Sequence, residues 1–377
     1  MEIKVENLLF YVTYILVILL DFLTKTQFIA QYPVVSASII PGFILTTFLL
    51  IVTILLEHKV TVIRLVYMLA IIIFSIIIAK MSGNYQKIIT IGLLLLAIGN
   101  KNIYTILKIH LFTISLMMML LFASYKLGIL PGGFSLRDNT VRYYLGFSYT
   151  SYASNYLFHL IITAIFVYKE KLNFIIWLIF LMLNRVFFDL TDTKSAYYLS
   201  LLVLLLFLIV KNIKDSSKIE KISKYFEKFS FPVFTLIILL MTKLYDNGNN
   251  LMERVNELLT YRLMLGAQAL REYGISIFGT KIVWSGFNSG KQYLYVDSSF
   301  LNILLNYGVV LVLLFSLGYY LLGKKNIYRD KFYFLSFVFL MLHSLFDPQF
   351  IEISYNPFIL FLGLALLSSN EIEKINY

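Results

Sequence analysis

The apolar residues of this chain are gathered into long blocks, and this feature limits its fold more than any other. Most blocks run for about 15–22 residues and are separated by short polar stretches, as membrane-crossing helices require. A transmembrane β-barrel would show alternating segments of about 10 residues, and the sequence has none. We therefore expect an all-α polytopic membrane protein with a single integral membrane domain over residues 1–377.

Composition agrees with this expectation. Only 14% of the residues are charged and 59% are hydrophobic, whereas about a quarter of a soluble domain is charged. The absence of cysteine excludes disulfides, thiolate metal sites and a cysteine nucleophile. A net charge of +11 would suggest nucleic acid as the partner of a soluble protein, but here we expect basic cytoplasmic loops and no nucleic acid. The first apolar block lacks a basic leader and a cleavage site, so we expect a retained helix rather than a signal peptide.

The blocks predict about twelve transmembrane helices. Lys211–Lys228 and Lys324–Lys331 are strongly basic and fall on one side of the alternating spans, which places that side and both termini in the cytoplasm. The opposite side holds an external loop over residues 126–155 and a large external loop over residues 244–296, between the ninth and tenth spans. The predicted spans are 8–24, 36–56, 65–79, 88–99, 109–124, 154–168, 172–188, 196–210, 231–243, 298–322, 332–346 and 355–368.

Arginine is distributed against the usual positive-inside trend. Six of the eight arginines fall on the predicted external side. Lysine is sufficient to anchor a loop against anionic lipid, whereas the planar guanidinium is preferred where phosphate or carboxylate must be held by two hydrogen bonds. The pattern predicts an anionic ligand at the outer leaflet, and arginine that only reaches toward lipid headgroups is the alternative. These arginines are Arg137, Arg142, Arg185, Arg254, Arg262 and Arg271.

The first external loop combines arginine with aromatic residues. Pro131-Gly132-Gly133 predicts a turn, and Arg142 lies close in sequence to several tyrosines, among them Tyr149. Aromatic rings beside guanidinium groups suit a sugar bound through its apolar face with its phosphate held by arginine. Tyrosine is also the usual residue of the membrane interface, which is the alternative for each ring taken alone.

The second external loop is far longer than two spans require, and such loops are usually functional. Leu251 to Tyr273 predicts one amphipathic helix on the membrane surface. At about 100° per residue, Arg254 and Arg262 fall on nearly the same face of this helix, whereas Arg271 lies opposite Arg262. We therefore prefer Arg262 as the ligand contact. A glycine-rich stretch closes the loop, and Asp297 stands at the mouth of the tenth span.

Several of these segments resemble the O-antigen polymerase and ligase superfamily, which includes capsular polysaccharide polymerases. Arg262 followed by a stretch ending in F-G resembles one motif of that family, and Asp297, ten further residues and Gly308 resemble another. The segment from Arg142 through L-G-F to an asparagine resembles a third. The resemblance covers essentially the whole chain. The family's ligases, and some of its polymerases, have histidine where this chain has Asp297, and a histidine often follows L-G-F where this chain has Tyr149. These departures make the ligase branch the less favoured one.

The resemblance implies polymerisation of undecaprenyl-diphosphate-linked oligosaccharide repeat units at the outer face of the bacterial cytoplasmic membrane, for capsule, exopolysaccharide or O-antigen. The expected partners are the lipid-linked donor and acceptor, membrane lipid, and possible flippase and chain-length regulator proteins. Such an inverting transfer needs cations beside the leaving diphosphate and a base for the acceptor hydroxyl. We assign Arg142 and Arg262 to the diphosphate, with Lys194 and Arg254 in support, and Asp297 to the base.

Other assignments stay open at this point. Asp297 could instead cap the helix that follows, and His343, His159 or Tyr149 could be the base or a sugar contact. We expect no metal and no cofactor, because two neighbouring acids without histidine, Asp189 and Asp192, are a weak metal signal. A lipid-linked glycan flippase or transporter, a polyprenyl-phosphate monosaccharide transferase, an acyltransferase, or a ligase that delivers glycan to another acceptor are the alternative functions.

Overall fold

The computed structural model describes residues 5–56, 62–99, 101–137, 139–285, 293–325 and 330–365, and the described part is almost wholly helical. Both chain ends, Arg329 in the predicted basic loop, residues 286–291 of the glycine-rich stretch and residues 366–368 of the last predicted span lie outside these ranges. The helices before the first external loop are α1 (Val5–Leu23), α2 (Phe28–Gln31), α3 (Pro33–Leu55), α4 (Val62–Ser82), α5 (Tyr85–Ala97) and α6 (Ile103–Lys126).

The rest of the chain begins with the hairpin β1 (Phe134–Arg137) and β2 (Thr140–Tyr143). The helices α7 (Tyr152–Tyr168), α8 (Phe174–Thr191), α9 (Lys194–Lys211) and α10 (Ser217–Asp246) follow, with the short η1 (Lys169–Lys171) between the first two. The second external loop holds α11 (Asn250–Leu258) and α12 (Arg262–Tyr273). The chain then continues with α13 (Ser299–Lys325), α14 (Lys331–Ser344), η2 (Pro357–Leu360) and α15 (Phe361–Leu364).

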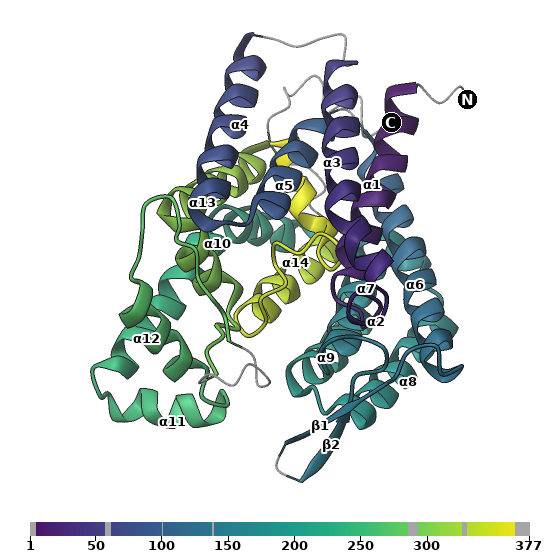
Figure 1. Cartoon of the computed structure of the whole chain (residues 1–377), viewed down its shortest axis with the longest axis vertical. Helices are drawn as coiled ribbons and strands as arrows, with labels where there is room; N and C mark the ends of the chain where they lie inside the picture. The colour runs from purple at the N-terminus through teal and green to yellow at the C-terminus, as the bar shows by residue number, and fades with distance from the viewer. Residues whose placement is uncertain are drawn as a thin grey trace.

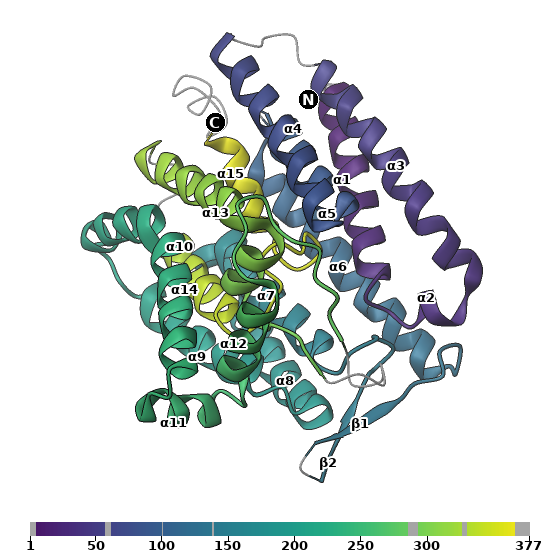
Figure 2. The same cartoon turned by 60° about the vertical axis from the view of Figure 1, so that its left-hand side comes forward.

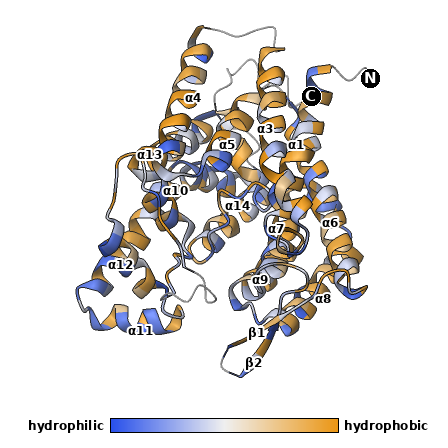
Figure 3. Cartoon of the chain, viewed as in Figure 1, coloured by the Kyte–Doolittle hydropathy of each residue, from blue (hydrophilic) through white to orange (hydrophobic). Residues whose placement is uncertain are grey.

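The expectation of an all-α membrane protein is confirmed. Among the described residues, eight helices are long and apolar enough to cross a membrane, and α5 and α14 are shorter apolar helices. A helix lies over each of the first eleven predicted spans, whereas the twelfth is only the short η2 and α15 within the described residues. The count of twelve spans and their topology stay predictions. Figure 3 shows apolar colour along the long helices and more polar colour over α11 and α12.

The predicted external segments contact one another, and so do the predicted cytoplasmic turns. On the predicted cytoplasmic side, Lys169 pairs with Asp330 at 2.5 Å, and Lys331 Nζ donates to the carbonyl of Ile213 at 2.8 Å. These contacts join the turns after α7, α9 and α13. The hairpin and α11 lie at the opposite end of the molecule from the facing ends of α3 and α4 (Figure 1).

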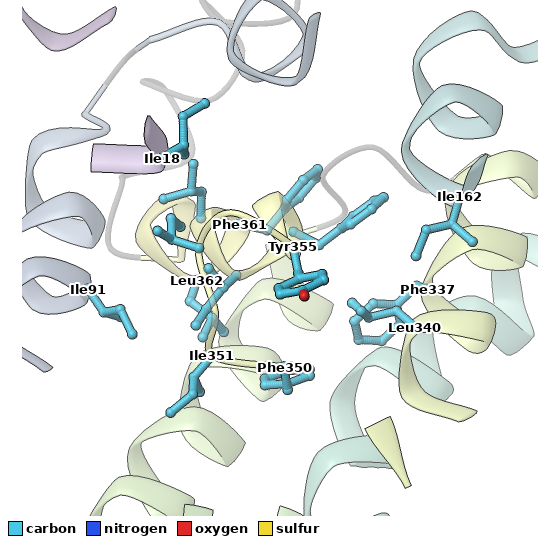
Figure 4. Packing of buried hydrophobic residues seen from close by; sticks show 14 of the residues in the cluster. Ile18, Ile91, Ile162, Phe337, Leu340, Phe350, Ile351, Tyr355, Phe361 and Leu362 are labelled. Atoms are coloured by element: carbon cyan, nitrogen blue, oxygen red, sulfur yellow. The ribbon is translucent and has the colours of Figure 1, made fainter. Parts of the chain in front are cut away.

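The core lies where the C-terminal segment returns to the middle of the bundle. Buried side chains from α1, α5, α7 and α14 meet residues of the segment 345–365 (Figure 4). In α7 an uninterrupted run from Ala153 to Phe166 is buried, so this helix is surrounded on all sides by protein. A helix covered in this way can carry polar side chains into the interior, because its neighbours supply their partners. Asn155, near the N-terminal end of α7, has such a partner in Asp347, and His159 lies one turn further along the same helix.

A bend in α13 anchors the end of the second external loop. Gly308 has a φ of 80° inside α13, where the helical conformation is interrupted. The amides of Val309 and Val310 bond to the carbonyls of Ser276 and Ile277 at 3.1 and 3.0 Å instead of to their own helix. The loop segment passes closest to α13 at Gly279. A Cβ added there would lie 2.2 Å from the Asn306 carbonyl oxygen, so only glycine fits. The loop is therefore fixed to the helix by backbone bonds, and Figure 2 shows it descending beside α13.

The prediction of one continuous amphipathic helix over 251–273 is wrong. The chain breaks at Thr260 and Tyr261, which have φ of 52° and 64°, and α11 and α12 are separate helices. Positive φ is unfavourable for these residue types, so local bonds must stabilise the break. The buried Asn256 supplies them, because its carbonyl accepts from the Tyr261 amide and its side chain accepts from the Met264 amide. The rotational relation expected between Arg254 and Arg262 therefore does not apply.

Candidate active site

Arg262 and Asp297 form an ion pair across the second external loop. Arg262 is the first residue of α12, and Asp297 precedes α13 by two residues. Arg262 Nε donates to Asp297 Oδ2 at 3.0 Å, and the two side chains are 25% and 27% exposed. Asp297 accepts a hydrogen bond from the guanidinium of Arg262. The amides of Ser299 and Phe300 donate no hydrogen bond to Asp297. The helix-cap alternative for Asp297 is therefore not supported.

Arg142 reaches the same region from the first external loop. The hairpin pairs Ser135 with Arg142, and Arg142 is buried with its Nε donating to the Thr191 carbonyl at 2.7 Å. Arg137 Nη2 donates to the Asp192 carboxylate at 2.6 Å. Together the two arginines fasten the hairpin to the turn between α8 and α9. Burial, and then the nearby charge of Arg137, lower the pKa of Arg142.

Tyr149 connects Arg142 with the ion pair. Its hydroxyl lies close enough to the Arg142 guanidinium to affect the pKa of that group, and the charges of Arg262, Asp297 and Asp347 act on the pKa of the Tyr149 hydroxyl. Burial raises the pKa of Tyr149, so its hydroxyl stays protonated and able to donate. We call Arg142, Tyr149, Arg262, Asp297 and Asp347 the arginine cluster. Its members come from four segments that are far apart in sequence.

Asp347 is the member that the sequence did not single out. It follows α14 and is buried, and it accepts from Ser195 Oγ at 2.9 Å and from Asn155 Nδ2 at 3.2 Å. Burial raises the pKa of Asp347 to about 6, although the charge of Arg262 opposes that shift. Burial likewise raises the pKa of Asp297 against the opposing effect of Arg262. Two carboxylates with raised pKa values beside the same guanidinium are therefore available to take up a proton.

His343 and His159 lie behind Asp347, in the protein interior. His343 Nε2 is 3.3 Å from Asp347 Oδ2, and the two histidine rings meet edge to face with centroids 5.2 Å apart. Both are almost completely buried, and no nitrogen of either ring has a hydrogen-bond partner. Asn155 Oδ1 is also unbonded. His343 is therefore the histidine next to Asp347. His159 contacts His343 and lies further from the arginine cluster.

The remaining predicted residues lie outside the arginine cluster. Lys194 is the exposed first residue of α9, next to Ser195, and Arg254 is exposed on α11. Neither forms a hydrogen bond or ion pair with another described residue. Arg271 pairs with Asp246 at 3.5 Å, and Arg185 pairs with Asp189 at 2.8 Å, so both have other partners. Within the described ranges, no three His, Asp or Glu side chains gather in a group that could hold a metal ion.

The arrangement joins fixed cations, proton acceptors and a phenol group at the predicted external ends of the helices. Guanidinium groups held by neighbouring atoms can stabilise negative charge without reorganising when it forms. A partly buried carboxylate with a raised pKa can accept a proton from a hydroxyl group. The cluster is therefore equipped for a transfer in which an anionic group leaves and a hydroxyl attacks. No protein-family model, curated protein or solved structure matches this chain.

Proposed function

We propose that the chain transfers a glycan from a polyprenyl-diphosphate carrier to a sugar hydroxyl of a second lipid-linked repeat unit, at the external side of the membrane. The observation that carries the proposal is the joining of Arg142, Tyr149, Arg262 and Asp297 in one cluster. The sequence resemblance to the polymerase and ligase superfamily rests on three of these residues. Their convergence from separate loops is what a shared active centre requires.

Each member of the cluster has a role in this reaction. Arg262 and Arg142 bind the diphosphate and neutralise the charge that develops as its bond to the sugar carbon breaks. The acceptor hydroxyl attacks that carbon from the opposite face and passes its proton to Asp297 or Asp347. Tyr149 donates a hydrogen bond to a phosphate or sugar oxygen. The leaving diphosphate remains on its lipid, and the new glycosidic bond replaces the one that broke.

The first test replaces the two arginines. We expect Arg262→Ala and Arg142→Ala each to abolish long-chain polymer in cells, while single repeat units accumulate on the lipid carrier. Arg262→Lys should recover less than about a tenth of the activity, because an ammonium group cannot supply the two parallel hydrogen bonds of guanidinium. Gel analysis of chain length and extraction of lipid-linked glycan measure both effects.

Arg271→Ala serves as the matched control, because Arg271 lies in α12 but pairs with Asp246 outside the arginine cluster. It should leave the distribution of chain lengths unchanged. A normal distribution in Arg262→Ala cells would contradict the proposal. A flippase predicts another result, since its loss would trap repeat units on the cytoplasmic leaflet, where an impermeant periodate reagent cannot oxidise them.

A further inference from the structure

A second set of charged side chains lies beside the arginine cluster. Lys25 Nζ is 2.6 Å from Asp21 Oδ1 and 3.0 Å from Glu352 Oε2, and Lys87 pairs with the other oxygen of Glu352. The amide of Ser354 also donates to Asp21 at 2.9 Å. We call Asp21, Lys25, Lys87 and Glu352 the lysine network. Its two cations and two anions balance, and Lys87 is its most accessible member, at 33% exposed.

Half-buried aromatic rings connect the lysine network to the arginine cluster. Tyr152 lies within electrostatic range of Lys25, Lys87, Glu352 and Tyr149, and its ring centroid is 5.7 Å from that of Tyr149. From the other side of the site, Tyr295 lies within electrostatic range of Tyr152, Glu352 and Asp297. The ring of Trp284 is 5.4 Å from that of Tyr295. Aromatic rings therefore lie close to both charged groups.

A buried hydroxyl without a hydrogen-bond partner belongs to a tyrosine whose ring packs against the lysine network. Tyr355 is 1% exposed, and its hydroxyl has no hydrogen-bond partner. Lys25 Nζ lies 5.8 Å from the centre of its ring, and Tyr156 stacks on it at 3.7 Å. A buried hydroxyl without a partner costs about 1–3 kcal/mol, so such groups usually bond to water or a ligand.

From these observations we infer that the lysine network and the rings of Tyr152, Tyr295 and Trp284 form a subsite for one neutral sugar of the lipid-linked glycan, an inference that rests on the proposed function. Aromatic faces suit the apolar face of a pyranose. Lys87 donates to a sugar hydroxyl while Glu352 accepts from its neighbour, which is how a lysine–carboxylate pair binds two adjacent hydroxyls. The network carries no net charge, so it offers no excess cation to hold the carboxylate of a uronic acid, and its donors and acceptors suit a neutral sugar.

The test compares two ligands on the purified full-length chain in nanodiscs. One is undecaprenyl diphosphate without sugar, and the other is the lipid-linked oligosaccharide extracted from host cells that lack this chain. We expect the glycan to increase wild-type affinity by at least about tenfold, which corresponds to about 1.4 kcal/mol. Lys87→Met and Tyr295→Leu should remove this increase and leave the affinity for bare undecaprenyl diphosphate unchanged. Lys243→Met, at an exposed lysine of α10, is the control and should keep the increase.

The two ligands separate the inference from the function on which it rests. Arg262→Ala should weaken binding of both ligands, since both carry diphosphate. If Tyr295→Leu, which breaks no ion pair, keeps the full increase from the glycan, the subsite is refuted while the diphosphate site stands. If Lys87→Met and Tyr295→Leu weaken both ligands equally, the lysine network is structural and the inference also fails. If the wild-type chain binds neither ligand, the proposed function and the subsite fall together.

Discussion

At the scale of single residues, the two carboxylates of the arginine cluster differ in their surroundings. Asp297 is about a quarter exposed and bonds to Arg262, whereas Asp347 is buried among Ser195, Asn155 and His343. The accessible position of Asp297 makes it the first choice for contact with the acceptor hydroxyl. Asp347 is better placed to receive a proton afterwards, because burial raises its pKa to about 6.

Substitution distinguishes these roles. We expect Asp297→Asn to lower the polymerisation rate in membrane vesicles by about a hundredfold or more, the range typical of a lost general base. Asp246→Asn is the matched control, because Asp246 pairs with Arg271 away from the cluster. Near-normal turnover in Asp297→Asn would transfer the role of base to Asp347.

The raised pKa of Asp347, about 6, predicts a pH dependence. A carboxylate with this pKa is ionised above pH 6 and becomes protonated as the pH falls through 6. We therefore expect the rate to decline below about pH 6 and to stay level above it. Asp347→Asn should lower the rate and remove this inflection, as rate measurements between pH 5 and pH 8 would show. An unchanged profile in Asp347→Asn would exclude its titration from the reaction.

The sequence predicted much of the site but not all of it. The enrichment of arginine on the predicted external side indicated Arg142 and Arg262. Asp297 was indicated by its position just before the predicted tenth span. Asp347 was missed because it stands in a short loop without a basic neighbour, and its partners Asn155 and Ser195 lie on other helices. The lysine network was missed for the same reason, since Lys25 and Lys87 look like ordinary loop lysines until Glu352 is placed between them.

At the scale of elements, the long apolar helices were predicted well and the structure of the second external loop was not. Long apolar blocks determine helices directly, because an unpaired backbone cannot remain in lipid. The break between α11 and α12 could not be predicted from periodicity, since it depends on the bonds that Asn256 makes to Tyr261 and Met264. The bend of α13 likewise depends on contact with a distant segment at Gly279.

The contact between Gly279 and Asn306 predicts that two glycine substitutions lower the free energy of unfolding by different amounts. Gly248 and Gly279 both have positive φ, but nothing lies within 4 Å of a Cβ added at Gly248, whereas one added at Gly279 meets the backbone of Asn306. Gly248→Ala should cost about 1 kcal/mol through backbone conformation alone. Gly279→Ala should cost about 1–3 kcal/mol more, because backbone must move. Thermal unfolding of the two variants in detergent measures the difference, and equal melting temperatures would contradict the tight crossing.

At the scale of the whole molecule, the proposal needs both external loops on one side of the membrane. The chain has no cysteine, so single cysteines report on topology without background. An impermeant maleimide should label Leu136→Cys and Leu258→Cys, which are 67% and 83% exposed, in intact cells. Ser217→Cys, at the start of α10, should be labelled only after permeabilisation. If Leu136→Cys and Leu258→Cys were labelled from opposite sides of the membrane, the two loops could not share an active site and the proposal would be wrong.

The backbone bonds between Ser276–Thr280 and the bend at Gly308 also determine how specificity can be transplanted between related chains. A graft that ends where the external loop ends would separate Gly279 from the carbonyl of Asn306 that it was fitted against. The smallest exchangeable unit therefore extends past the loop, through the outer half of α13 to Val310. A crossover inside this unit would pair a loop with an α13 bend that it does not fit. A crossover beyond Val310 would transfer the loop together with the bend that holds it.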